Sequence, residues 1–411
     1  MTSTPVPETL PISTHVKATP ASPTVAKSLV KGNTAISDSD WDGFLSRPRK
    51  PPGSFTTAEY YWRDRQRWLK ECGYLLRPRY NPDWKPSWVG TDKDWYTCED
   101  SLIPLGRGHV LDATRISDGE LVVLKKISHE AHPTEAEIGQ LLSSEPLASD
   151  PANNCVPILG VLSDPQDKDI QLIIMPMLRR CFSPQFQTVG EVLEFFRQAL
   201  VGLRFMHRRN VAHRDATILN IMMDPTPMFP EMFHYASELY NRDRTGPAKC
   251  FARTERSPKY FWTDFGLSVK YDLDSETAPR LELPIMGGDK TAPEHQGELY
   301  HVPCDPIPTD VYYVGNLMRE YFVQKYTNLE IMRPLVDDMV RDVPAERPTM
   351  DEVVERFEVT CKKLHWWNLR ARLVRRSEWY IVRFVLGIGH VVRTVRYVVK
   401  GLPAVPVPPS T

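Results

Sequence analysis

Residues 213–220 of this chain read HRDATILN, and two short motifs follow, DFG at 264–266 and APE at 292–294. The first motif carries Asp215 and Asn220, and the second supplies a further carboxylate, Asp264. Carboxylate and amide oxygens suit a hard cation, and a carboxylate can accept a proton from a hydroxyl. Asp and Asn are also common turn-capping residues in loops. One motif alone could arise by chance, but three motifs in this order indicate a single site.

Together these motifs, H-R-D-x-x-x-x-N, D-F-G and A-P-E, resemble those of eukaryotic protein kinases over roughly residues 100–362. The resemblance implies a two-lobed α+β fold, with a five-stranded antiparallel sheet and a helix in the small lobe and a mainly helical large lobe. It also implies transfer of the ATP γ-phosphate to a protein hydroxyl, with ATP and Mg²⁺ as cofactors. Asp215 would be the catalytic base, and Asn220 and Asp264 would be the metal ligands.

Residues 119–125 read GELVVLK and resemble the third strand of a kinase, which supplies a lysine to the α- and β-phosphates. Lys125 occupies that place. Lys126 is the alternative, but one step along a strand points a side chain to the other face. The acidic partner is expected on the next helix, where Glu137 fits best. Glu135, two residues earlier, would point elsewhere on a helix.

The loop that covers the phosphates in a kinase is only partly matched. Gly106 and Gly108 begin a G-x-G pattern, but Leu111 stands at the third glycine position. This spacing predicts a shortened loop whose backbone amides can still contact phosphate. A G-x-G pair is equally an ordinary turn.

The linker between the lobes is expected at residues 175–178, which read MPML. Met175 would stand at the back of the adenine pocket. Pro176 replaces the acid that is usual in kinases and removes one backbone donor. The main-chain groups of Met177 or Leu178 would then bind adenine.

Other matches concern the support of the site rather than its chemistry. The resemblance implies that Glu294 pairs with Arg347 and that Asp310 braces the loop around Asp215. It also implies that Arg214 contacts the activation segment, residues 264–294. Candidate phosphorylation sites in that segment are Ser268, Tyr271, Ser275, Thr277 and Thr291.

Several positions depart from the kinase pattern. Thr217 stands where serine/threonine kinases have a lysine, Leu219 where tyrosine kinases have an arginine, and Gly288 where the family has a threonine before A-P-E. Residues 221–263 form a long insertion between Asn220 and D-F-G. The favoured hypothesis is a protein kinase, with serine/threonine specificity ahead of tyrosine. The alternatives are a pseudokinase that binds nucleotide or acts as a scaffold, and a small-molecule phosphotransferase.

A second resemblance concerns the stretches LNIMMDP, LELPIMGGDKTAPE and TDVYYVGNLMREYF. They are similar to poorly characterised kinase-like proteins of mushroom-forming fungi, over roughly residues 55–375. This resemblance implies a fungal origin and the same fold, and it implies no substrate.

Helices are expected at 56–72, 133–142, 189–207, 309–323 and 349–363. Shifts in composition along the chain predict five parts. The parts are a disordered segment (1–50), an extension with a helix and a Pro/Trp-rich strap (51–100), a small lobe (101–178), a large lobe with the 221–263 insertion (179–364) and a basic tail (365–411).

The net charge and the cysteines limit the partners and the compartment that the sequence predicts. The formal net charge of -1 gives no reason to expect a nucleic-acid partner. The seven cysteines are scattered without a C-x-x-C pair, which favours a reducing compartment over a disulfide framework or a zinc site. No signal-peptide core is expected at the N-terminus. A cytoplasmic protein is therefore expected, and peripheral attachment to membranes through its tail is a separate hypothesis.

That tail attachment rests on residues 370–400, RARLVRRSEWYIVRFVLGIGHVVRTVRYVVK. On a helical wheel its arginines fall on one side and most of its large apolar residues on the other. This is typical of a basic amphipathic helix on an anionic membrane surface. A helix that packs on the large lobe or on a partner protein is the alternative.

Overall fold

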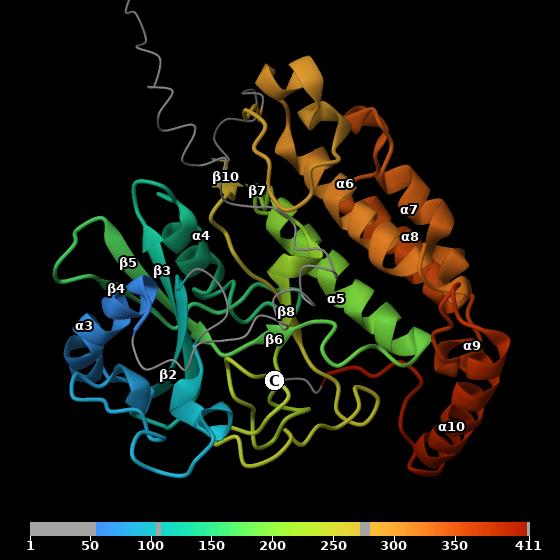
Figure 1. Ribbon diagram of the computed structural model, residues 1–411. Helices are drawn as coiled ribbons and strands as arrows, with labels where there is room; N and C mark the ends of the chain where they lie inside the picture. The colour runs from blue at the N-terminus through green and yellow to red at the C-terminus, as the bar shows by residue number, and fades with distance from the viewer. Residues whose placement is uncertain (1–54, 104–107, 272–279, 409–411) are drawn as a thin grey trace, which may run out of the picture. The chain divides into compact units, whose positions relative to one another are not determined.

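The computed structural model describes residues 55–103, 108–271 and 280–408, in which an antiparallel sheet precedes a mainly helical region (Figure 1). The fold is therefore a mixed one, with strands first and most helices later, as the sequence predicts.

The sheet has five antiparallel strands in the order β1-β2-β3-β5-β4. Its first strand is formed by residues 74–76, which precede the predicted start of the small lobe at 101. Leu76 of this strand pairs with Ala113 of the second. The strands are β1 (Tyr74–Leu76), β2 (Val110–Arg115), β3 (Leu121–Ser128), β4 (Gly160–Ser163) and β5 (Ile170–Pro176).

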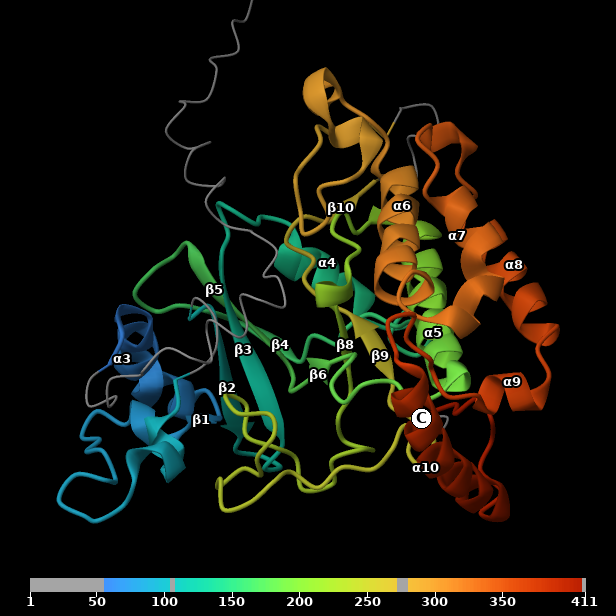
Figure 2. The same cartoon turned by 45° about the vertical axis from the view of Figure 1, so that its right-hand side comes forward.

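The two faces of the sheet are covered by different helices, because side chains alternate along each strand. Leu111, Val122 and Leu124 point to a buried cluster under α3 (Thr57–Glu71). Val123 points the other way, toward α4 (Glu135–Leu142) and the main core. Figures 1 and 2 show these two helices on opposite sides of the sheet.

Helix α3 confirms the helix predicted at 56–72. A capping box joins Thr56 and Glu59 at its start, and Gly73 follows its end with a φ of +92°. Glu59 is buried and accepts from Arg79 at 2.5 Å. This ion pair ties the helix to the long loop between β1 and β2.

The helical region is built around α5, which is buried along most of its length and packs against α8. Figure 2 shows these helices side by side. The predictions at 189–207 and 349–363 are confirmed, while the helix predicted at 309–323 starts earlier and ends in a π-helical turn. The elements are α5 (Val189–His207), α6 (Pro306–Met318), the π-turn Arg319–Val323, α7 (Arg333–Met339) and α8 (Met350–Lys362).

Short strand pairs hold the loops between the sheet and α6. A three-stranded sheet has the order β6-β8-β9, and β10 pairs with β7. These strands are β6 (Arg179–Arg180), β7 (Val211–Ala212), β8 (Ile221–Met223), β9 (Tyr260–Trp262) and β10 (Val269–Lys270). Single 3₁₀ turns lie at Pro78–Tyr80, Trp95–Thr97, Glu99–Ser101, Ile218–Asn220, Pro293–His295, Gly297–His301, Thr327–Met332 and Pro344–Glu346.

Strands β8 and β9 lie within the predicted insertion and pair with each other. The loop between these two strands therefore spans residues 224–259, which is shorter than the predicted insertion at 221–263.

The C-terminal part forms α9 (Trp366–Arg370) and α10 (Tyr380–Val399). The helical tail predicted over 370–400 is thus confirmed only from Tyr380 onward. Within the described residues, no helix has both the length and the apolar character needed to cross a membrane.

Candidate functional site

Lys125 lies on the face of β3 that is turned toward α4, and its ammonium bridges two carboxylates. Its Nζ lies 2.5 Å from Glu135 Oε1 and 2.9 Å from Asp264 Oδ1. Burial works to lower the pKa of Lys125, but the two carboxylates raise it above its usual range. The lysine is therefore firmly charged and fixed between segments far apart in the sequence.

The partner of Lys125 is Glu135 and not the predicted Glu137. Glu135 is the first residue of α4 and is buried, whereas Glu137 is exposed and has no polar partner among the described residues. Two residues along a helix turn a side chain by about 200°. The buried face of α4 carries Glu135, Ile138 and Leu142, an i, i+3, i+7 pattern that is visible in the sequence.

Asp264 is held in the left-handed region, with a φ of +65°, which is uncommon for a residue other than glycine. Its side chain is 49% exposed. Loss of solvation within the protein acts to raise the pKa of Asp264. The charge and hydrogen bond of Lys125 outweigh this effect, so the pKa lies below its usual range. Asp264 is consequently an ionised carboxylate at neutral pH.

Asp215 and Asn220 contact each other across the turn that joins them. Asn220 Nδ2 donates to Asp215 Oδ2 at 2.8 Å and to its backbone carbonyl at 2.9 Å. Burial raises the pKa of Asp215 above the usual range for aspartate. The structure thus brings together the predicted base and one predicted metal ligand.

A pair of glycines lies directly on the Asp215 carboxylate. The Gly288 N–H donates to Asp215 Oδ1 at 2.7 Å. A Cβ at Gly287 would stand 2.4 Å from the same oxygen, so only glycine permits this approach. The glycine pair is visible in the sequence before A-P-E, where the kinase pattern marks only the absence of a threonine at Gly288.

Thr217 points into the same region. Its Oγ1 is buried and has no hydrogen-bond partner among the described residues. A Cβ at Gly288 would lie 3.3 Å from this hydroxyl. The site therefore has an unpaired hydroxyl where the kinase pattern has a lysine.

The loop that carries Asp215 is braced from below by Asp310, as predicted. Asp310 accepts from the backbone N–H of His213 at 2.6 Å and from that of Arg214 at 2.7 Å. The Arg214 backbone has a φ of +64°. Such a conformation persists only where the surroundings hold it, and Asp310 provides that support.

The expected contact of Arg214 with the activation segment is also present. Its Nη2 donates to the Leu283 carbonyl at 2.7 Å. Among the candidate phosphorylation sites, Ser268 is buried and donates to the His213 carbonyl, while Ser275 and Thr277 lie outside the described residues.

Glu294 and Arg347 form the predicted ion pair, with N–O distances of 2.6 and 2.7 Å. The Arg347 side chain is fully buried, and Thr309 Oγ1 also donates to Glu294. Burial acts to raise the pKa of Glu294. The ion pair with Arg347 outweighs this effect, so the pKa of Glu294 lies below its usual range.

Of the two glycines predicted to contact phosphate, Gly106 lies outside the described residues. Gly108 has a φ of +75°, and its carbonyl accepts from the indole of Trp62 on α3 at 3.0 Å. A Cβ at Gly108 would clash with Ala58. Gly108 therefore serves close packing against α3, and its role toward phosphate stays a prediction.

The predicted linker leaves β5 at the edge of the site. Met175 pairs in register with Val123 on β3. The Met177 N–H donates to the Leu121 carbonyl at 3.1 Å, so it is not free for a ligand. The expected contacts of Met177 and Leu178 with adenine stay a prediction.

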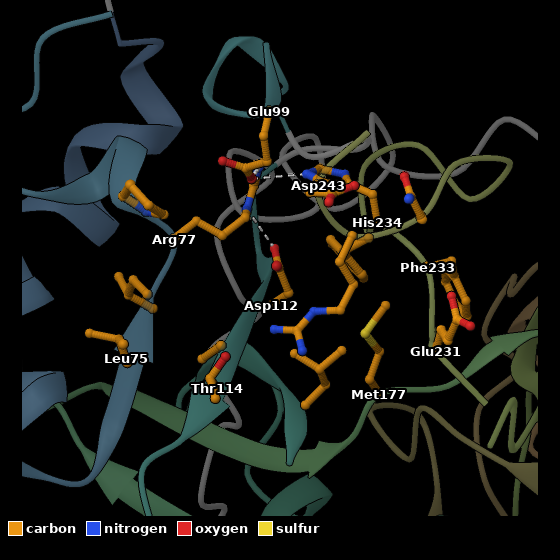
Figure 3. Close-up of a pocket in the computed structure, with 17 residues that line it drawn as sticks. Leu75, Arg77, Glu99, Asp112, Thr114, Met177, Glu231, Phe233, His234 and Asp243 are labelled. Carbon is orange, nitrogen blue, oxygen red and sulfur yellow. Dashed lines mark hydrogen bonds and ion pairs between the residues drawn. The ribbon is translucent and has the colours of Figure 1, made fainter. Parts of the chain in front are cut away.

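A cavity of about 630 Å³ opens beside this linker (Figure 3). One wall is the sheet, with Leu75, Asp112 and Leu121, and the other is the 224–259 loop, with Phe233 and His234. Lys125 and Asp264 do not line it. Met177 of the predicted linker does line it.

The 224–259 loop and the loop between β1 and β2 meet at the rim of this cavity. His234 Nε2 lies 3.0 Å from Glu99 Oε1, and Arg244 donates to the Tyr96 carbonyl. Glu99 also pairs with Arg77 at 3.3 Å. The predicted insertion thus contacts the sheet side of the molecule as well as the helical region.

No group of three His, Cys, Asp or Glu side chains suited to a metal ion occurs in the described part of the chain. Asp264 and Asn220 are nonetheless hard oxygen donors, and Asp264 is ionised. Mg²⁺ commonly binds proteins through one or two such side chains, together with substrate phosphates and water. The donor set therefore fits Mg²⁺ that arrives with a nucleotide.

The chain was also compared with known proteins. No protein-family model matches it, and no curated protein is significantly similar to it.

Proposed function

We propose that this chain is a protein kinase that transfers the γ-phosphate of ATP to a protein hydroxyl, with serine or threonine as the favoured acceptor. The observation that carries the proposal is the Lys125 bridge between Glu135 and Asp264, beside the Asp215–Asn220 pair. Each of these residue types has a distinct part in phosphoryl transfer, in the two-lobed fold that the motifs imply.

The roles follow from the charges and contacts of these groups. Lys125, kept charged by two carboxylates, would bind the α- and β-phosphates. Asp215 would accept the proton of the substrate hydroxyl, and its raised pKa makes it a stronger base than an ordinary aspartate. Asn220 and the Gly288 N–H orient that carboxylate.

Asp264 and Asn220 would hold Mg²⁺, which supplies charge neutralisation on the phosphates. The Asp264 carboxylate is suited to this because Lys125 keeps it ionised.

The test is transfer of radiolabelled phosphate from ATP to the chain itself and to a generic protein substrate, with Mg²⁺ present. Mg²⁺-dependent transfer by the wild-type chain is expected. No transfer, combined with a rise in melting temperature on adding ATP, would reject the kinase proposal in favour of a nucleotide-binding pseudokinase.

The choice between Glu135 and Glu137 gives a sharp prediction. Glu135→Gln is expected to lower transfer by about 10²-fold, because a lysine displaced by ~1 Å positions phosphate poorly. Glu137→Gln changes the same functional group two residues away and is expected to leave transfer unchanged. Rates of the two purified variants, with circular dichroism to check folding, measure this. Equal losses in both variants would refute the assignment of Glu135.

One observation favours the pseudokinase alternative. Asp112 stands opposite Val123 in the sheet and pairs with Arg77 at 3.1 Å, beside the linker where adenine would lie. A charged pair suits a nucleobase face less well than apolar side chains do. If ATP binds poorly and Asp112→Val tightens its binding, the alternative gains weight.

A further inference from the structure

Helix α10 contacts the rest of the protein through its polar side. His390 donates to the Arg370 carbonyl at 2.9 Å, Thr394 contacts His390, and Tyr397 is buried. These residues follow an i, i+4, i+7 spacing, so they share one stripe of the helix. The helix thus docks by a stripe that is mostly polar.

The opposite side of α10 is apolar and turned outward. Ile381 is 78% exposed, Phe384 70% and Val399 82%. With successive residues rotated by about 100°, the outward arc holds no polar side chain other than the phenol of Tyr380. The residues of this arc, here called the outward face, are Tyr380, Ile381, Phe384, Val385, Ile388, Val391, Val392, Val395, Val398 and Val399.

This orientation is the reverse of that of an ordinary surface helix, which turns its apolar stripe to the core. A contiguous apolar face of this kind marks a surface that binds a partner or a membrane. In both views α10 lies apart from the five-stranded sheet (Figures 1 and 2).

The charges around the outward face indicate the partner. Helix α10 contains no acidic residue. Arg383 has no ion-pair partner among the described residues, and Arg396 and Lys400 share the single carboxylate of Glu255 at 3.3 Å. By the same rotation, Arg383 falls in line with the docked stripe, whereas Arg396 and Lys400 lie beside one edge of the outward face. Cations beside an apolar face are the arrangement that binds acyl chains and anionic headgroups together.

A second copy of α10 is a poorer match for the same face. Two such helices would bring arginines and lysines together with no acidic residue on either to offset them. Exposed Trp379 and Tyr380 at the start of the helix are also typical of the boundary between headgroups and acyl chains.

We infer that α10 lies in the surface of an anionic membrane, with its outward face at the acyl boundary and Arg396 and Lys400 at the lipid phosphates. The inference does not depend on the proposed kinase activity, because the docked polar stripe and the outward face exist without it. It assigns the tail to membrane attachment of the whole chain.

The test is sedimentation of the full-length chain with phosphatidylcholine vesicles, with and without phosphatidylserine. Binding is expected only with phosphatidylserine and is expected to weaken as salt is added. Ile381→Glu combined with Phe384→Glu should lower the partition constant at least about tenfold. Arg396→Gln should lower it about fivefold.

A matched control places the same two charges on exposed apolar residues elsewhere, Val359→Glu with Leu239→Glu, and should bind as wild type does. Circular dichroism checks that both double variants remain folded. A wild-type chain that stays in the supernatant, or that binds neutral vesicles equally well, would overturn the inference. A dimer that is seen by light scattering and is abolished by the Ile381→Glu, Phe384→Glu variant would also overturn the inference. It would assign the outward face to a second copy of the chain.

Discussion

Asp215→Asn is expected to lower phosphate transfer by about 10²- to 10⁴-fold, the contribution that a positioned general base makes. The substitution keeps the size of the side chain and so the packing under Gly287, but it leaves one acceptor oxygen for the two donors, Asn220 Nδ2 and the Gly288 N–H. What it removes is the carboxylate that can accept a proton from the substrate hydroxyl. Initial rates of radiolabel transfer measure the effect.

Asp337→Asn on α7 is the matched control, because Asp337 is exposed and lies outside the site. It should transfer phosphate as the wild-type chain does. Wild-type rates from Asp215→Asn would show that Asp215 is not the base, and would favour transfer by another route or a contaminating activity.

The pH dependence of transfer gives a second readout of the same residue. Burial raises the pKa of Asp215, so the acid limb of the rate profile should lie above the usual range for aspartate. Activity is lost as pH falls through this pKa, because a protonated Asp215 cannot accept the hydroxyl proton. In Asp215→Asn the residual rate should lack this limb.

Arg347→Ala is expected to lower the free energy of unfolding by about 3–5 kcal/mol, the loss that follows removal of one partner from a buried ion pair. Glu294 would remain largely buried without its cation, and the Pro308 carbonyl would lose a donor. Urea unfolding followed by circular dichroism measures the change. This prediction does not depend on the proposed activity.

Arg341→Ala is the control, since Arg341 makes exposed ion pairs with Asp338 and Glu346. Exposed ion pairs contribute little to stability, so this variant should unfold nearly as wild type does. If both variants lost the same small free energy, the Glu294–Arg347 pair would not be a main support of the fold.

The effect of Arg347→Ala should also depend on pH. Arg347 lowers the pKa of Glu294 against the effect of burial, so the stabilisation is present above pH 4.5, the ordinary value for glutamate, and is lost as pH falls through the lowered pKa. The difference between wild type and variant should therefore shrink in acid.

Much of the architecture could be predicted because it depends on local patterns. The apolar run at 121–124 is typical of a strand, and the apolar spacing at 189–207 predicts a helix; both elements are present. The Glu294–Arg347 pair could be predicted only through the resemblance, because its partners are far apart in the sequence.

Other features were set by contacts between distant segments. Strand β1 is too short to be recognised alone, and it exists because it pairs with β2 across a long loop. The approach of Gly287 and Gly288 to Asp215 likewise depends on how the activation segment folds back over the loop.

The sequence by itself determined which chemical groups are present at the site and that the tail carries an apolar and a basic side. Only the tertiary structure decided that Lys125 meets Glu135 rather than Glu137, because the start of α4 sets which side chain turns inward. It also decided that α10 docks by its polar stripe, since periodicity shows that a helix has two faces but not which one meets the protein.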